Sequence, residues 1–249
     1  MVLKRLPFRD PRTVARDIPG VLDVLFPRLS GGLVASMNRQ AVSFEGLMPV
    51  LDELVDQSKL QKAMLFELAM VRAEHILAGL LEPKWSEYIQ IAVKRQSRHY
   101  DAKVRDVSES DLEVAEHAAQ NLVEMLRSVQ AQHHGTQLEA SPVIPGMGWI
   151  ASGVGDFSLG KILIEVKHTN RNFVSGDFRQ VLIYWILKYA DAIEHDVDVW
   201  SECLLLNPRR NSALIINFDT LLQSASGGSD RVELCELLRS IVGRKLERI

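Results

Sequence analysis

The strongest constraint on the fold comes from residues 153–168, GVGDFSLGKILIEVKH, which predict a β-hairpin. Side chains alternate across a β-strand, so Leu163, Glu165 and Lys167 share one face of the second strand. The even-numbered residues between them are isoleucine or valine and share the other face. We expect this even-numbered face to pack in the core.

A two-residue turn at Gly160 and Lys161 would place Asp156 opposite Glu165, because glycine suits the first position of a type II′ turn. Directly opposed residues have Cβ atoms roughly 4.5–5.5 Å apart, and like charges there are destabilising. A divalent cation would offset the repulsion, and Mg²⁺, which binds one or two carboxylates and keeps several waters, suits such a pair. Lys167 would lie beside a metal-bound water. The hairpin therefore predicts a metal site.

These residues resemble the core of the PD-(D/E)XK nuclease superfamily, in which an aspartate precedes a (D/E)xK triplet. Asp156 corresponds to the aspartate, and Glu165, Val166 and Lys167 match the triplet. The proline of the family's name is absent, but residues 153–156, GVGD, are similar to the GxxD form common in RecB-like members. The resemblance implies an α/β (α+β) fold with a restriction-endonuclease-like core, a mixed central sheet flanked by helices.

A helix is predicted after the hairpin, at residues 177–190, where apolar residues recur at helical spacing. Gln180 and Tyr184 lie one turn apart on a separate stripe of this helix. They match the QxxxY motif that RecB-like and lambda-exonuclease-like members carry on the helix after the ExK strand. Two apolar strands around a turn at residues 207–211 complete the expected order of strand, strand, helix, strand, strand.

The resemblance implies a Mg²⁺-dependent phosphodiesterase, expected to be a deoxyribonuclease, in which Mn²⁺ substitutes for Mg²⁺. The two carboxylates and the Val166 carbonyl would bind the metal, which activates a water molecule. The lysine would orient or help deprotonate that water, and the glutamine and tyrosine would position the lysine, the water or the nucleic-acid strand. The expected catalytic residues are Asp156, Glu165, Lys167, Gln180 and Tyr184.

A nucleic-acid partner, expected to be DNA, has to be reconciled with a net charge of −3, because phosphate-binding surfaces are usually positive. Cations gather around the predicted site. Arg171 and Arg179 would contact phosphate oxygens bidentately, and Lys161 would add a third cation. Residues 94–105 form a second basic run. Both this run and the N-terminal cations, Arg12 among them, could follow a phosphate backbone, but for the N-terminal cations an ordinary solvated face is the preferred interpretation.

The same hairpin contains most of a phosphate-binding P-loop, which would make the chain a nucleotide hydrolase. Gly155, Gly160 and Lys161 have the required spacing. However, Ile162 stands where a Ser or Thr hydroxyl should reach Mg²⁺, and a strand follows where the motif needs a helix. We therefore reject this interpretation.

The chain is predicted to divide into a mostly helical region, residues 1–107, and a nuclease core with a C-terminal helix, residues 108–249. A Ser-x-x-Asp capping pattern opens the core's first helix, on which Glu116 and Glu124 are candidates for a further acidic metal ligand. The helical region would dock a protein partner or DNA. Its helices are expected at residues 14–26, 44–55 and 60–81.

The expected compartment is the cytoplasm. No run approaches the roughly 18 apolar residues of a membrane span, and the N-terminus lacks the apolar stretch of a signal peptide. Cys203 and Cys235 are expected to be buried thiols, with no disulfide framework. An oligomer is compatible with the sequence. Endonuclease and exonuclease action stay open.

Three biological interpretations remain. The first is an active nuclease subunit of a bacterial anti-phage defence or DNA-processing system. The main alternative is a catalytically silent nuclease-fold module that binds nucleic acid or a protein partner. The third is an interaction or structural protein in which the helical half carries the function. The presence of every core residue favours the active enzyme, because a decayed site usually loses its aspartate or lysine first.

Overall fold

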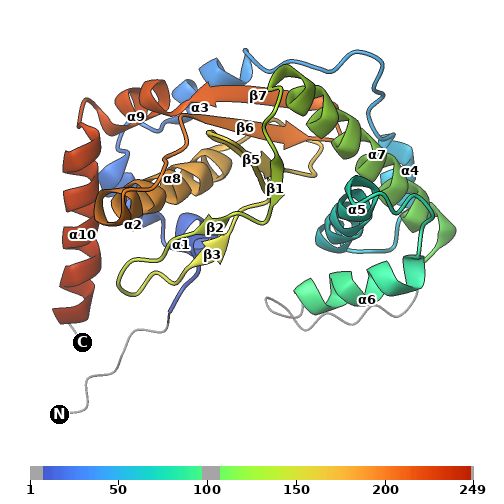
Figure 1. Cartoon of the computed structure of the whole chain (residues 1–249), viewed down its shortest axis with the longest axis horizontal. Coiled ribbons are helices and arrows are strands. Elements are labelled where there is room, and N and C mark those ends of the chain that lie inside the picture. Colours follow the sequence, from blue (N-terminus) through green and yellow to red (C-terminus); the bar gives the residue numbers. More distant parts are fainter. Residues whose placement is uncertain (1–7, 97–106, 248–249) are drawn as a thin grey trace, which may run out of the picture.

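The computed structural model describes residues 8–96 and 107–247, and this part of the chain is a mixed α/β fold around a five-stranded sheet (Figure 1). The mixed α/β class predicted from the sequence is therefore confirmed. The strand order is β1-β4-β5-β6-β7; β5 and β6 are parallel, and every other neighbouring pair is antiparallel. The strands are β1 (Leu138–Ala140), β4 (Phe157–Leu159), β5 (Ile162–Val166), β6 (Glu202–Asn207) and β7 (Ser212–Asn217). A separate pair joins β2 (Val143–Ile144) to β3 (Gly153–Val154).

The hairpin of β4 and β5 has the predicted register. Leu159 pairs with Ile162, so Gly160 and Lys161 form the two-residue turn. Gly160 has a φ of 55°, a left-handed conformation that glycine adopts without steric cost. One further step along the register brings Asp156, the residue directly before β4, opposite Glu165.

Strand β5 is buried on both of its faces. Its even-numbered residues pack against α5 (Lys62–Leu77) and α7 (Glu109–Gln132), as expected for a core face. The odd-numbered face is not solvated either, because Leu163 packs against α8 (Ser175–His195) and Glu165 is fully buried. A central strand between two helical layers has no exposed face. The predicted site therefore lies in the interior, between the sheet and α8.

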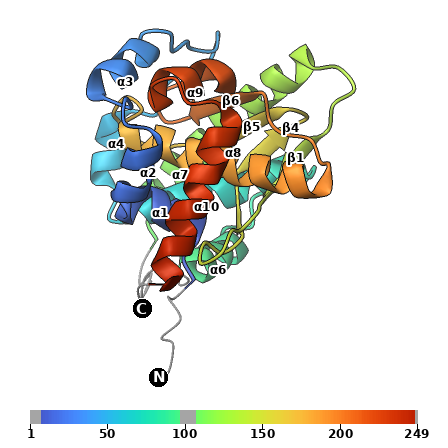
Figure 2. The same ribbon diagram turned by 90° about the vertical axis from the view of Figure 1, so that its left-hand side faces the viewer.

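The helices form two groups on opposite sides of the sheet. Helices α4 to α7 lie on one side, and α8 on the other side carries the N-terminal and C-terminal helices on its outer surface (Figure 1). Figure 2 shows α10 crossing in front of α8 and α2, with which it is in contact. The remaining helices are α1 (Pro11–Asp17), α2 (Pro19–Leu25), α3 (Gly31–Asn38), α4 (Asp52–Gln57), α6 (Trp85–Gln96), α9 (Phe218–Ser226) and α10 (Arg231–Glu247).

Two helix predictions in the first half need correction. Residues 14–26 form two helices because Pro19 starts α2, and the residue before a proline disfavours the α conformation. Residues 44–51 are not helical, and only α4 follows them. The side chain of Asn211 holds this segment by donating to the Phe44 and Leu47 carbonyls at 2.8 Å each, and by accepting from the Phe44 N–H at 3.0 Å.

The capping pattern before α7 is confirmed, since the Ser108 hydroxyl and the Asp111 carboxylate bond each other's backbone N–H groups. The two cysteines are buried free thiols, as expected. The predicted boundary near residue 107 adjoins residues 97–106, which lie outside the described part, as does most of the basic run at 94–105. The division of the chain at this point stays a prediction. None of the described helices combines the length and apolar character needed to cross a membrane.

Candidate active site

The two carboxylates of the hairpin lie at the end of β5. Asp156 is anchored across the hairpin, because its Oδ2 accepts a hydrogen bond of 2.8 Å from the Val166 N–H. Lys167 directly follows β5, and its N–H donates to the Leu206 carbonyl at 2.7 Å, which extends the parallel pairing with β6. The backbone thus fixes Asp156, Glu165 and Lys167 at one edge of the sheet.

Glu165 and Lys167 are joined to α8 through one amide. Lys167 Nζ donates to Glu165 Oε1 and to Gln180 Oε1, each at 2.9 Å. Gln180 Nε2 donates to Glu165 Oε1 and to the Tyr184 hydroxyl. All four side chains are buried. The structure therefore brings together the strand residues and the helix residues that the sequence analysis placed in one site.

The position of Gln180 and Tyr184 follows from the way α8 is packed. Residues 180–187 of this helix are all buried, because α8 lies between the sheet and the outer helices α1 and α10. Residues four apart on a helix share a face, so the amide and the hydroxyl both project toward β5. Buried polar groups require partners, and this network satisfies both Gln180 amide atoms.

Arg12 belongs to the site, although the sequence analysis treated the N-terminal cations as a solvated surface. Its Nη2 lies 3.2 Å from Glu165 Oε1 and 3.5 Å from Asp156 Oδ1, and its side chain is 30 % exposed. The only local signal is Asp10-Pro11, a cap followed by proline at the first helical position, which starts α1 directly before Arg12. Nothing in the residue spacing links a helix of seven residues to a hairpin more than 140 positions later.

The charges around the carboxylates are balanced by the protein's own cations. Arg12 and Lys167 both approach Glu165, and Arg12 also approaches Asp156. Asp177 lies 4.0 Å from Lys167 Nζ and 3.4 Å from Arg171 Nη1, so a third carboxylate is also compensated. Contrary to the expectation from the hairpin, the opposed carboxylates therefore need no metal ion for charge balance, although the site keeps ligands suited to one.

The two carboxylates have different proton affinities. Burial, and then the negative charge of Glu165, raise the pKa of Asp156 to about 7. Burial by itself would raise the pKa of Glu165, but the charges of Lys167 and Arg12 outweigh burial and lower it. Burial, followed by the charge of Glu165, raises the pKa of Tyr184, so this hydroxyl stays protonated at neutral pH. Near pH 7 Asp156 therefore exchanges between its protonated and ionised forms, while Glu165 stays ionised.

The donor set fits a hard cation that keeps part of its water shell. Among the described residues, no group of three or more His, Cys, Asp or Glu side chains converges to form a metal site, so the protein ligands would be the carboxylate pair and a backbone carbonyl. Glu165 Oε2 is buried and accepts no hydrogen bond from any described residue. An unsatisfied buried carboxylate oxygen is costly, and coordination to a cation would satisfy it.

The two glutamates of α7 do not join the carboxylate pair. Glu116 forms an ion pair with Arg72 of α5 at 2.7 Å, and Glu124 pairs with Arg127 on its own helix at 2.8 Å. Helix α7 packs against the even-numbered face of β5, whereas Glu165 and Lys167 are on the odd-numbered face. The sheet itself therefore separates α7 from the site.

The three cations expected to bind phosphate occupy different places. Arg171 lies beside the site, next to Asp177. Arg179 pairs with Asp23 of α2. Lys161 pairs with Asp198 at 2.9 Å and lies in the hairpin turn, at the other end of β5 from Lys167, roughly 20 Å away at about 3.3 Å per residue. Of the three, only Arg171 is adjacent to the carboxylate network.

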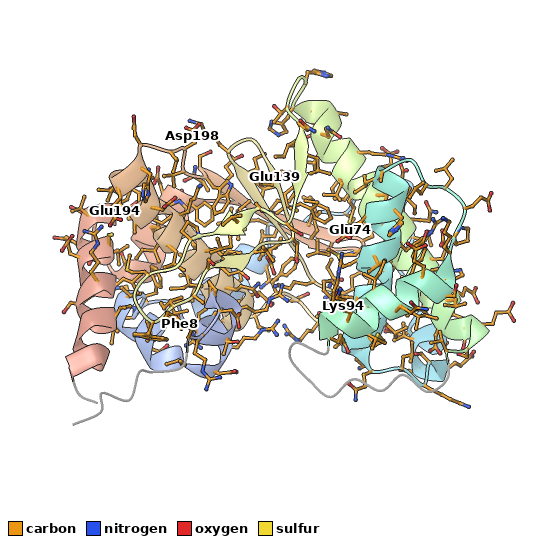
Figure 3. All side chains as sticks on the ribbon, turned by 60° about the horizontal axis from the view of Figure 1, so that its bottom comes forward. Phe8, Glu74, Lys94, Glu139, Glu194 and Asp198 are labelled. Carbon is orange, nitrogen blue, oxygen red and sulfur yellow. The ribbon has the colours of Figure 1, made fainter. Side chains whose placement is uncertain are left out.

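A cleft of about 320 Å³ leads to Lys167. Helix α1 forms one wall with Arg12 and Arg16, and α5 forms the other wall with Lys62 and Phe66. Figure 3 views this side of the molecule, with Phe8 marking the segment before α1 and Lys94 marking α6 across from it.

Comparisons with protein-family models, curated proteins and solved structures found no match to this chain.

Proposed function

We propose that the protein is a Mg²⁺-dependent nuclease that hydrolyses phosphodiester bonds in nucleic acid, with DNA as the expected substrate. The observation that carries the proposal is the buried network in which a hairpin carboxylate and lysine are held by the amide of the next helix. The strand order, and the fact that α8 connects the parallel strands β5 and β6, agree with the restriction-endonuclease-like core that the resemblance implies.

The proposed metal ligands are Asp156, Glu165 and the Val166 carbonyl. When bound, Mg²⁺ would polarise the scissile phosphate and lower the pKa of a bound water. An ammonium group has three N–H donors, and Lys167 uses two of them on Glu165 and Gln180. The third donor is left for a water molecule or a phosphate oxygen. Gln180 therefore determines where the lysine points, and the neutral Tyr184 hydroxyl holds Gln180 in place.

The test is cleavage of plasmid, linear duplex and single-stranded DNA, each with and without Mg²⁺. Lys167→Met and Asp156→Asn keep the side-chain volumes and remove the charges, and each is expected to lower the rate about 10²- to 10⁴-fold. Lys161→Met and Asp198→Asn are the matched controls, because this exposed pair lies at the far end of β5. Cleavage by Asp156→Asn at the parent rate would refute the assignment.

A catalytically silent module is the second candidate, and one observation favours it. Arg12 already supplies a cation within 3.5 Å of both carboxylates, so the fold is compensated without a metal ion. The two candidates differ in metal binding. A silent module would give no Mn²⁺ or Mg²⁺ heat in calorimetry, and it would bind nucleic acid equally well after addition of a chelator. Membership of a defence or DNA-processing system stays a prediction from the resemblance alone.

A further inference from the structure

The route to the proposed catalytic residues is narrow. Glu165 is fully buried, the side chain of Asp156 is 11 % exposed and that of Lys167 is 7 % exposed. Lys167 forms part of the floor of the cleft between α1 and α5. A scissile phosphate that meets the free donor of Lys167 in this cleft therefore has to pass between two helices.

The size of the cleft limits what can enter it. Its volume of about 320 Å³ is at the lower end of small-molecule sites, which run from roughly 300 to 1,000 Å³. A DNA duplex is much larger than a unit of this volume, since its major groove alone is about 12 Å wide. A cleft of this size suits a unit no larger than a small molecule, such as one nucleotide of a single strand.

The walls carry the groups that bind a single strand. Phe66 is a half-buried aromatic side chain in the cleft, and its ring centroid lies 6.5 Å from that of His168. Bases of any identity stack on such rings. Arg16 on α1 and Lys62 on α5 are exposed and make no hydrogen bond or ion pair with another residue in the described part of the chain. They are therefore available to contact the phosphates on either side of a stacked base.

The charge of the cleft argues against a long duplex footprint. Among the described residues, its lining carries five cationic and four acidic side chains, so this part of the cleft lacks the continuous positive surface that follows a double helix. This near balance of positive and negative charge suits a cleft that contacts only two or three phosphates of a strand.

From these observations we propose that the cleft takes single-stranded nucleic acid, as a strand end or a displaced strand, and excludes intact duplex. Phe66 stacks on the base whose phosphate lies beside Lys167. This inference rests on the proposed nuclease function, because it assumes that a phosphodiester reaches Lys167.

Binding of a short fluorescent oligonucleotide, alone or annealed to its complement, tests the inference by fluorescence anisotropy of the full chain. Ca²⁺ replaces Mg²⁺ so that the strand stays intact. We expect the single strand to bind at least tenfold more tightly than the duplex. Phe66→Leu, which keeps an apolar side chain in the packing, should weaken single-strand binding roughly 5- to 150-fold, the loss of one base stack. Phe66→Trp should retain the binding.

Phe44→Leu is the matched control, because Phe44 is also half-buried and packs against the same core cluster, but lies outside the cleft. Lys62→Gln should reduce the slope of log affinity against log salt by about 0.7, the value for one phosphate contact on a single strand. Equal affinity for duplex, or no effect of Phe66→Leu, overturns the inference. Metal-dependent cleavage of duplex as fast as single strand overturns it and leaves the nuclease proposal intact, whereas preferred binding of the single strand without cleavage of any nucleic acid overturns the nuclease proposal alone.

Discussion

Replacing Arg12 by glutamine is expected to weaken the metal-free fold and to strengthen metal binding in the same protein. The guanidinium lies 3.2 Å from Glu165 Oε1 and 3.5 Å from Asp156 Oδ1, so its removal leaves two buried carboxylates with less positive charge. Breaking a fully buried ion pair costs about 3–5 kcal/mol. Arg12 is 30 % exposed, and Lys167 still pairs with Glu165, so a cost of about 1–3 kcal/mol is expected here. For a chain of this length that cost lowers the Tm by roughly 2–12 °C.

The gain in metal affinity follows from the same distances. A divalent ion held by both carboxylates would lie within about 5 Å of the guanidinium, and Coulomb's law then gives about 2 kcal/mol of repulsion even at the dielectric constant of water. Removing that repulsion should tighten binding by at least about tenfold. Glutamine keeps an amide donor and removes only the charge. The stability loss of Arg12→Gln should therefore be reversed by millimolar Mg²⁺ or Mn²⁺.

Calorimetric titration with Mn²⁺ and thermal unfolding at increasing Mg²⁺ measure the two effects separately. Arg16→Gln is the control, because Arg16 lies one turn further along α1, is exposed and does not approach either carboxylate. Arg16→Gln should leave both the metal-free Tm and the Mn²⁺ affinity unchanged. If Arg12→Gln binds Mn²⁺ no more tightly than the parent, Arg12 orients the ligands instead of competing with the metal, and the electrostatic reasoning is refuted.

The remaining predictions concern pH. Because the pKa of Asp156 is raised to about 7, metal binding below that pH must displace a proton. The Mn²⁺ affinity should therefore rise about tenfold per pH unit up to pH 7 and then level off. Titrations in buffers of different ionisation enthalpy count the released proton, and an affinity that stays constant from pH 5.5 to 8 would contradict the assignment. The pKa of His168 falls from 6.5 to about 4 on folding, so between these values the unfolded chain binds more protons. The contribution of His168 to the free energy of unfolding is therefore fully present above pH 6.5, and it falls by up to about 3 kcal/mol as the pH is lowered to 4. Urea unfolding of His168→Leu should lose this acid-side slope, and an unchanged slope would assign it to other groups.

The local part of the site could be predicted from the sequence. The alternation of β5 and the glycine at position 160 fix the hairpin register, and the register sets Asp156 opposite Glu165. The spacing of Gln180 and Tyr184 on one helix places both side chains on the same face. Each of these relations depends on residues within about ten positions of one another, where the strand and helix periods decide which side chains are neighbours.

The contributions of distant segments could not be predicted in this way. Two charged residues in an alternating strand suggest a solvated face, yet α8 covers that face and α1 packs on α8. Whether Glu165 is exposed or buried depends on which helices pack over β5, and no pattern within the hairpin contains that information. The helix prediction at residues 44–55 failed for a related reason, since the Asn211 side chain, from the turn between β6 and β7, holds the backbone there in an irregular conformation.

The position of Arg12 shows how the local sequence and the distant segments act together at the site. The hairpin predicts paired carboxylates, but their charge depends on what the rest of the chain brings to them, and the fold brings a guanidinium from α1. A site that is electrically compensated in this way is stable without metal. When this site binds a divalent cation, Asp156 has to release its proton and the carboxylates have to give up their contact with Arg12. A phosphate entering the cleft would offer Arg12 a second anion and ease that exchange, so metal and nucleic acid should bind more tightly together than either does alone.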